Sequence, residues 1–277
     1  MKKLIKFLLS PFLPILYIIR DNKPQFQSLN LIKTFYVNFR VLPFAQARHL
    51  PIYIYKNTKI YKLGKITIES KHIYQGMISI GRYDYKARTP GKIHNGGHII
   101  FKGPVLIHGG LVLNNMGTIV FGGYNKISEG CLLNIWDRLE LGEHSILGFF
   151  SFCMDTDMHF TINCDSKMVA RNTKPIIIGR CNWIGNSTYI KKGTITPDYT
   201  IVASSNSLLS RDYTSIGEYC VLGGVPAKKI ASNIRRIYNI KAERELREYF
   251  NNHPEVDSYV IDLGDESVDN FCTSNFL

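Results

Sequence analysis

One segment of the sequence gathers side chains that can move protons. His159 closes the run Asp-Thr-Asp-Met-His at residues 155–159, which also contains Asp155 and Asp157. Imidazole changes its charge near neutral pH, so a positioned histidine can accept a proton from a hydroxyl group and return it to a leaving thiolate. The segment therefore predicts acid–base chemistry, with His159 as the base and the two aspartates beside it.

Two other interpretations of this segment have to be weighed. A histidine considered alone is more often a solvated loop residue than a catalytic one. A metal site is the second alternative, because His144 precedes the segment and Cys153 and Cys164 flank it. A zinc site needs three or four ligands, and the segment itself holds one histidine. We expect no metal.

The elements around this segment follow a period of six residues. From Ile178 onward the sixth residues are mostly aliphatic: Ile178, Ile184, Ile190, Thr196, Val202 and Leu208. The same step recurs upstream, with a shifted register, at Ile127, Leu133 and Leu139 and at Leu141, Leu147 and Cys153. A helix would need steps of three and four, whereas short extended runs that turn every six residues stack into a β-solenoid.

The six-residue step is lost between Cys153 and Pro175, and a long insertion in a regular solenoid is usually functional. We expect three regions: an N-terminal basic, partly helical arm at 1–57, the solenoid at 58–230, and a C-terminal helix with an acidic tail at 231–277. The helix is expected near 241–250, where strong helix formers gather.

The chain of 277 residues has a formal net charge of +12, and this charge is concentrated at one end. Residues 1–65 contain twelve Lys or Arg and one acid, Asp21, which gives +11 there and +1 elsewhere. Such an end can face anionic lipid or simply be solvated. Nucleic acid is disfavoured because no recognised binding motif accompanies the charge.

The apolar run from Leu4 to Ile19 imitates a signal peptide, but Lys6, Pro11 and Pro14 interrupt it and no cleavage site of small residues follows. It is also shorter than the roughly 20 residues that span a bilayer. We expect an interfacial anchor or a hydrophobic arm. The six cysteines are irregularly spaced and form no C-x-x-C pair, which favours a reduced, cytoplasmic protein. A basic end that faces anionic lipid would place this protein at the inner face of the plasma membrane.

Three features, in order, resemble the hexapeptide-repeat acyltransferases, and within them the bacterial polysaccharide and sugar O-acetyltransferases. They are the Asp-x-Asp-x-His segment, the run Ile-Ile-Ile-Gly-Arg-Cys-Asn-Trp-Ile-Gly at 176–185, and the exit Gly-Val-Pro-Ala-Lys-Lys-Ile at 224–230. The resemblance covers residues 127–230 well and 58–126 less well. It implies a left-handed parallel β-helix, acetyl-CoA as co-substrate, a homotrimer with active sites between subunits, and His159 as general base.

The resemblance also places the acyl donor along the coils that hold Trp183, Lys191, Ser205 and Asn206 and past Pro226, Ala227 and Lys228. Cationic side chains then suit the phosphates of CoA: Lys191, Lys192, Arg211, Lys228 and Lys229. Trp183 can stack on the acceptor or on the pantetheine arm, or cover a subunit interface. The sequence departs from the family pattern at Thr196-Pro197 and at residues 203–207.

We therefore expect an enzyme that moves acetyl from acetyl-CoA to a sugar hydroxyl in capsule, lipopolysaccharide or another surface polysaccharide. Three alternatives stay open: an N-acetyltransferase acting on an amino sugar nucleotide, a non-catalytic β-solenoid scaffold, and a metal-dependent hydratase on the same kind of solenoid. Consumption of acetyl-CoA with a sugar alcohol would indicate the expected activity. Consumption with a sugar amine would indicate the N-acetyltransferase, and consumption with neither would indicate the scaffold.

Overall fold

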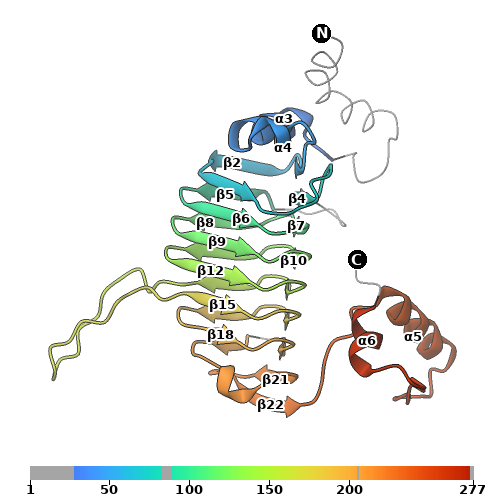
Figure 1. Ribbon diagram of the computed structural model, residues 1–277. Coiled ribbons are helices and arrows are strands. Elements are labelled where there is room, and N and C mark those ends of the chain that lie inside the picture. The colour runs from blue at the N-terminus through green and yellow to red at the C-terminus, as the bar shows by residue number, and fades with distance from the viewer. Residues whose placement is uncertain (1–27, 83–88, 205, 275–277) are drawn as a thin grey trace, which may run out of the picture.

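The computed structural model describes residues 28–82, 89–204 and 206–274. Its main body is a parallel β-helix, in which successive coils of the chain stack and contribute short strands to three sheets (Figure 1). The predicted solenoid of hexapeptide coils with helical additions at both ends is confirmed. The predicted interfacial arm, residues 1–23, lies outside the described residues.

The three sheets run along the length of the solenoid. The first contains β1 (Ile52–Ile54), β4 (Ile78–Arg82), β7 (Val105–His108), β10 (Asn125–Ile127), β13 (Ile146–Leu147), β16 (Trp183–Ile184), β19 (Ile201–Val202), β21 (Cys220–Gly223) and β22 (Lys228–Ser232). The second contains β2 (Thr58–Lys62), β5 (Gly91–Asn95), β8 (Val112–Asn115), β11 (Leu132–Ile135), β14 (Phe152–Met154), β17 (Tyr189–Lys191) and β20 (Leu208–Leu209). The third contains β3 (Lys65–Ile68), β6 (His98–Phe101), β9 (Thr118–Phe121), β12 (Arg138–Leu141), β15 (Ile176–Ile178) and β18 (Ile195–Thr196).

Neighbouring strands pair in parallel, except that β22 turns back antiparallel on β21 and ends the first sheet. A short 3-10 helix, η2 (Thr214–Ile216), lies between β20 and β21. The first strand begins at Ile52, so β1 lies inside the segment 1–57 that the sequence assigns to the N-terminal arm.

The periodic aliphatic residues point into the solenoid and form its core. Ile127, Leu147 and Ile184 are fully buried and stack in register on successive strands of the first sheet. In the third sheet two residues of one strand face inward, Leu139 and Leu141, which adds two residues to the coil. This addition explains why the six-residue register shifts upstream of Ile178.

The expected inward position of Leu208 is wrong by one residue. Val202 is buried, but the next buried side chain is Leu209, while Leu208 faces outward. The step is seven residues because the corner at 203–207 is one residue longer than the corner at 185–188, between Ile184 and Tyr189.

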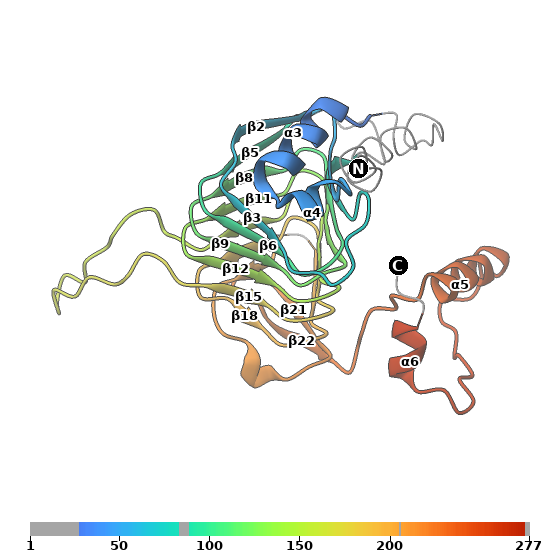
Figure 2. The same ribbon diagram turned by 45° about the horizontal axis from the view of Figure 1, so that its top comes forward.

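Helix α3 (Leu31–Val41) and the short α4 (Phe44–Ala47) close the N-terminal end of the solenoid (Figures 1 and 2). Asn30 caps the N-terminus of α3, since its Oδ1 accepts a hydrogen bond from the Lys33 N–H at 2.9 Å. The buried face of α3 forms hydrogen bonds with backbone groups of the edge strand β1. Asn38 donates to the Ile52 carbonyl at 2.7 Å and accepts from the Ile52 N–H at 3.0 Å, and the hydroxyl of Thr34 accepts from the Ile54 N–H at 3.0 Å.

Two helices follow the solenoid, α5 (Ile240–Asn252) and α6 (Val268–Thr273). The first agrees with the helix expected near 241–250, whereas α6 lies in the segment that was expected only as an acidic tail. The pair is tied together because the Tyr238 N–H donates to the Cys272 carbonyl at 2.8 Å. No helix among the described residues is long and apolar enough to cross a membrane.

Candidate active site

The insertion that holds His159 is a projecting arm (residues 155–175), which leaves the solenoid after β14 in the second sheet and returns at β15 in the third (Figures 1 and 2). Its two limbs pair antiparallel, with bridges between Thr156 and Thr173 and between Ile162 and Val169. A backbone hydrogen bond of 2.8 Å from the Asp157 N–H to the Asn172 carbonyl joins the limbs near the solenoid. The arm is therefore an ordered ribbon rather than a structureless loop.

Asp155 anchors the arm to the solenoid. It is fully buried, and its two carboxylate oxygens accept three backbone N–H bonds: from Trp136 at 2.8 Å, Asp137 at 2.7 Å and Arg138 at 2.8 Å. Burial raises the pKa of Asp155, and the three donors oppose that shift. Both oxygens already accept hydrogen bonds, so this carboxylate binds the turn between β11 and β12.

A lysine in the coil that follows the arm forms an ion pair with Asp157. The Lys192 ammonium lies 2.5 Å from Asp157 Oδ2 and also donates to the Arg171 carbonyl at 3.0 Å. One lysine thus contacts both limbs of the ribbon where they leave the solenoid. From the sequence alone, Lys192 is expected only to bind a phosphate of CoA.

His159 lies two residues beyond this anchor, on the exposed part of the arm. Its neighbours Met158 and Phe160 expose 45% and 68% of their surface, so the ribbon presents apolar side chains together with the imidazole. The described part of this chain supplies no hydrogen-bond or ion-pair partner to the His159 ring. A second molecule therefore has free access to the imidazole.

A polar row on the second sheet leads to the base of the arm. Asn114 and Asn134 stand in register on β8 and β11, and the Asn114 amide donates to Asn134 Oδ1 at 2.9 Å. The exposed Trp136 indole N–H donates to the same oxygen at 3.2 Å, and Asn134 Nδ2 lies 3.6 Å from the Met158 sulfur. Sequence reasoning missed this row, although the spacing of twenty residues between the two asparagines was a signal for it.

The residues predicted to hold the acyl donor lie on different faces of the chain. Lys191 is in β17 of the second sheet, one residue before the lysine at the arm. Trp183 is in β16 of the first sheet, exposed, with the Arg236 guanidinium 5.1 Å from its ring centre. Asn206 is exposed at the corner between these sheets with a positive φ of 65°, and Ser205 lies outside the described residues.

The remaining predicted donor residues lie in the last coil and the hairpin that ends it. Arg211 donates to the Ala227 carbonyl at 2.9 Å, and Ala227 itself is fully buried. Pro226 is exposed in the turn between β21 and β22, and Lys228 and Lys229 are exposed on β22. The structure thus brings Lys191 near the arm and places Trp183 and the β22 lysines on the first sheet.

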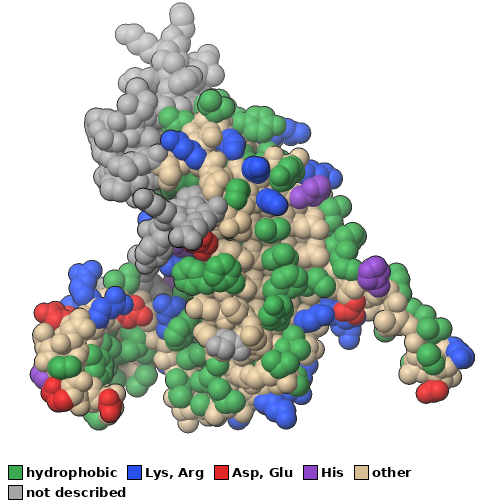
Figure 3. Space-filling view, turned by 180° about the vertical axis from the view of Figure 1, so that it is seen from behind, with side chains coloured by type: hydrophobic (Ala, Val, Ile, Leu, Met, Phe, Trp, Pro, Cys, Tyr) green, Lys and Arg blue, Asp and Glu red, His purple; other side chains and the backbone are tan. Residues whose placement is uncertain are grey.

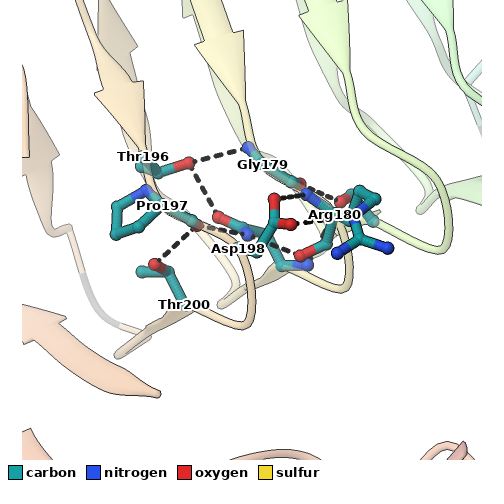
Figure 4. Close-up of polar contacts among 8 residues, drawn as sticks. Gly179, Arg180, Thr196, Pro197, Asp198 and Thr200 are labelled. Atoms are coloured by element: carbon teal, nitrogen blue, oxygen red, sulfur yellow. Dashed lines mark hydrogen bonds and ion pairs between the residues drawn. The ribbon is translucent and has the colours of Figure 1, made fainter. Parts of the chain in front are cut away.

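The Thr-Pro departure from the hexapeptide pattern is accommodated by hydrogen bonds at the corner between the third and first sheets (Figure 4). Thr196 Oγ1 accepts from the Gly179 N–H at 3.1 Å and donates to Asn182 Oδ1 at 2.7 Å, while Asn182 Nδ2 donates to the Pro197 carbonyl at 2.9 Å. A Cβ at Gly179 would lie 2.6 Å from the carbonyl carbon of Pro197, so only glycine fits there.

A second group of titratable side chains lies at this corner, away from the arm. Burial lowers the pKa of His144 to about 4, although the Glu143 carboxylate is 3.8 Å from its Nε2. Burial also raises the pKa of Cys181 to about 11. Both groups are therefore uncharged at neutral pH, which fits a structural position. In the part of the chain that the structure describes, no three or more potential ligand side chains gather as a metal site would require.

No family model matches the chain, and no curated protein matches it either. Among solved structures, the chain is similar to the polySia specific acetyltransferase NeuO, with 17% identity and a TM-score of 0.41 over 72% of this chain and 98% of that one. It is also similar to the polysialic acid O-acetyltransferase OatWY, with 20% identity and a TM-score of 0.35 over 70% of this chain and 96% of that one. A third is AntD, an N-acyltransferase from Bacillus cereus, with 18% identity and a TM-score of 0.39 over 74% and 89%. Likenesses this distant define neither the substrate nor the site residues of this chain.

Proposed function

We propose that this protein is an acyltransferase that moves acetyl from acetyl-CoA to a hydroxyl group of a sugar in surface polysaccharide synthesis. The observation that supports it most is the anchored arm: the hexapeptide solenoid is interrupted by an ordered ribbon that presents His159, and Asp155 and Lys192 fix the base of that ribbon. The resemblance of the surrounding motifs to the hexapeptide-repeat O-acetyltransferases points to the same reaction.

In the proposed reaction, His159 accepts the proton of the sugar hydroxyl while the oxygen attacks the thioester carbonyl of acetyl-CoA. The tetrahedral intermediate has an oxyanion, which backbone N–H groups stabilise. The intermediate collapses, the C–S bond breaks, and His159 returns the proton to the CoA thiolate. Transfer is direct, so no covalent acyl-enzyme is formed.

The amide row and Trp136 beside the arm suit a sugar acceptor. Asparagine side chains donate and accept hydrogen bonds, as sugar hydroxyl groups do, and an exposed indole offers an apolar face to a sugar ring. Asn134 Nδ2 lies 3.6 Å from the sulfur of Met158, the residue before His159, and Asn114 and Trp136 both donate hydrogen bonds to Asn134 Oδ1. They form the proposed acceptor side of the site.

The donor side requires a second copy of the chain. Trp183 and the β22 lysines lie on a different sheet from Lys191, so one chain does not gather all the proposed CoA ligands around His159. A homotrimer, in which the arm of one subunit meets the first sheet of the next, would bring them together. The solenoid face in Figure 3 has many exposed hydrophobic side chains, which is compatible with such packing. The trimer would work in the cytoplasm, where acetyl-CoA is available.

His159→Asn tests the proposal, because an amide keeps hydrogen-bonding capacity but does not take up a proton at neutral pH. We expect kcat for CoA release with a sugar acceptor to fall about 10²- to 10⁴-fold, with unchanged melting temperature and CoA binding. His72→Asn, an exposed histidine outside the arm, is the matched control. A normally folded His159→Asn protein with more than about a tenth of parental turnover would remove this residue as the base.

The nature of the acceptor is tested in the same assay. A panel of sugars with free hydroxyl groups, compared with amino sugar nucleotides, separates O-transfer from N-transfer. If CoA release is no faster with any acceptor, the chain is a scaffold rather than an enzyme. Replacing Lys228 and Lys229 together by Ala tests the donor side, since the KM for acetyl-CoA should rise while the KM for the acceptor stays constant.

A further inference from the structure

The N-terminal cap has an outer face that no coil of the solenoid covers. The buried face of α3 is used to bond β1, which leaves Ile32, Phe35 and Tyr36 on the opposite side. Ile32 exposes 83% of its surface, Tyr36 57% and Phe35 36%. A helix that ends a soluble domain normally turns polar residues outward, so this apolar face calls for an explanation.

The exposed face of α3 is continuous with that of α4. The Phe35 and Phe39 ring centres are 4.4 Å apart, and those of Phe39 and Phe44 are 5.9 Å apart. Arg40 is exposed one turn after Tyr36 on the same helix. We call the residues Ile32, Phe35, Tyr36, Arg40 and Phe44 the cap surface.

The segment that forms the cap and the first coil carries charge of one sign. Residues 28–68 contain seven Lys or Arg and no Asp or Glu: Lys33, Arg40, Arg48, Lys56, Lys59, Lys62 and Lys65. At this end of the molecule Figure 3 shows cationic and hydrophobic side chains next to one another. A protein surface that mixes aromatic groups with cations, and excludes acids, is complementary to the anionic headgroups and acyl boundary of a phospholipid bilayer.

The position of the cap allows contact with a flat surface. Helices α3 and α4 lie across the end of the solenoid, with the arm projecting from its side and α5 and α6 near its other end (Figures 1 and 2). Among the described residues, the cap surface is therefore the part that a bilayer approaching along the solenoid axis meets first.

We propose that the cap surface docks the protein on anionic lipid bilayers, with Ile32, Phe35 and Tyr36 entering the headgroup boundary and Arg40 and the neighbouring lysines binding lipid phosphates. This docking orients the solenoid axis perpendicular to the membrane plane and holds the arm at a fixed distance from the lipid surface. It is independent of the chemistry proposed for His159.

The test uses the full chain and vesicles of phosphatidylcholine with or without phosphatidylglycerol. The parent should float with the anionic vesicles and bind neutral ones more weakly, and salt should reduce the anionic binding. Arg40→Gln should lower the partition coefficient about 5-fold, the equivalent of one cation near an anionic surface. Ile32→Gln should lower it by a similar or larger factor, because an inserted aliphatic side chain is lost.

Matched controls are Lys102→Gln and Val260→Gln, an exposed cation and an exposed aliphatic residue away from the cap. A second readout reports insertion directly. Tryptophan fluorescence of Ile32→Trp, relative to the parent, should be quenched by lipids brominated on their acyl chains, whereas that of Val260→Trp should not. Circular dichroism and melting of each variant show that the fold is kept.

Three results would overturn the proposal. The full chain could fail to bind anionic vesicles. It could bind them while both cap variants keep parental affinity and Ile32→Trp is not quenched, which would assign the binding to residues 1–27. Alternatively, Ile32→Gln could abolish self-association in light scattering without changing lipid binding, which would make the cap surface a contact between copies of the chain.

Discussion

Lys192 Nζ lies 2.5 Å from Asp157 Oδ2 and 3.0 Å from the Arg171 carbonyl oxygen, so one side chain from the coil below holds both limbs of the arm. The ion pair is partly exposed, with 21% and 38% of the two side chains accessible. Such pairs contribute at most about 1 kcal/mol to stability. Their effect on the direction of the ribbon, and so on His159, is expected to be larger than their effect on folding.

Lys192→Met should therefore lower kcat about tenfold or more while the melting temperature falls by no more than about 3 °C, because catalysis depends on positioning more steeply than folding does. Turnover and thermal melting on the same preparations check this prediction. Lys167→Met is the control, since the Lys167 ammonium donates at 2.5 Å to the Cys164 carbonyl within the arm itself. Parental turnover in Lys192→Met would show that the ribbon keeps its direction without the lysine.

Asp155→Asn should destabilise the protein more than it alters the chemistry directly. The carboxylate accepts three backbone N–H bonds, and an amide offers one oxygen in their place. Each buried donor left without an acceptor costs about 1 to 3 kcal/mol, so we expect the melting temperature to fall by about 6 °C or more. Asp157→Asn, at a more exposed carboxylate, should melt within about 3 °C of the parent. If Asp155→Asn melts normally and is inactive, Asp155 takes part in the reaction itself.

The core of the solenoid was predictable because one inward side chain recurs at fixed steps. Ile178, Ile184, Ile190 and Val202 are each buried as the pattern predicts. The pattern fails where a corner changes length, as before Leu209, because a corner residue leaves no mark in the aliphatic periodicity. The two inward residues per strand at Leu139 and Leu141 shift the register for the same reason.

The candidate site was only partly predictable. The run at 155–159 indicated the position of the base, since polar and titratable residues interrupt the hexads there. The contact of Lys192 with the arm, and that of Arg236 with Trp183, join residues 35 and 53 positions apart and depend on how the chain folds back. A pattern of local spacing does not contain such contacts.

His144 predicts a pH dependence of stability. Burial holds its pKa at about 4, below the ordinary 6.5, so between these values the unfolded chain binds a proton that the folded chain does not. The contribution of this group is complete above about pH 6.5 and is lost as the pH falls towards 4, by up to about 3 kcal/mol. His144→Asn should flatten the fall in stability between pH 7 and pH 5, measured by chemical denaturation.

Asparagine suits this position because His144 has a positive φ of 60°, which asparagine tolerates better than most residues. His72→Asn, at an exposed histidine, should leave the pH profile unchanged. An equally steep profile in His144→Asn would assign the acid sensitivity to other groups.

Arg235 joins the C-terminal helices to the solenoid. Its guanidinium carbon lies 4.4 Å from the Tyr199 ring centre and 5.3 Å from that of Tyr219, two rings stacked at 5.0 Å on successive coils. Its Nη1 lies 2.5 Å from Asp269 Oδ1 in α6. Arg235→Gln removes the two cation–π contacts and the ion pair, so helices α5 and α6 should separate from the corner more often. Limited proteolysis of the segment between β22 and α5 should accelerate about tenfold, because cation–π contacts and a partly buried ion pair together contribute about one to two kcal/mol.

The control is Arg244→Gln, at an exposed arginine on α5, which should be cleaved at the parental rate. Unchanged cleavage of Arg235→Gln would show that the helices are held by other contacts, such as the Tyr238 to Cys272 backbone bond.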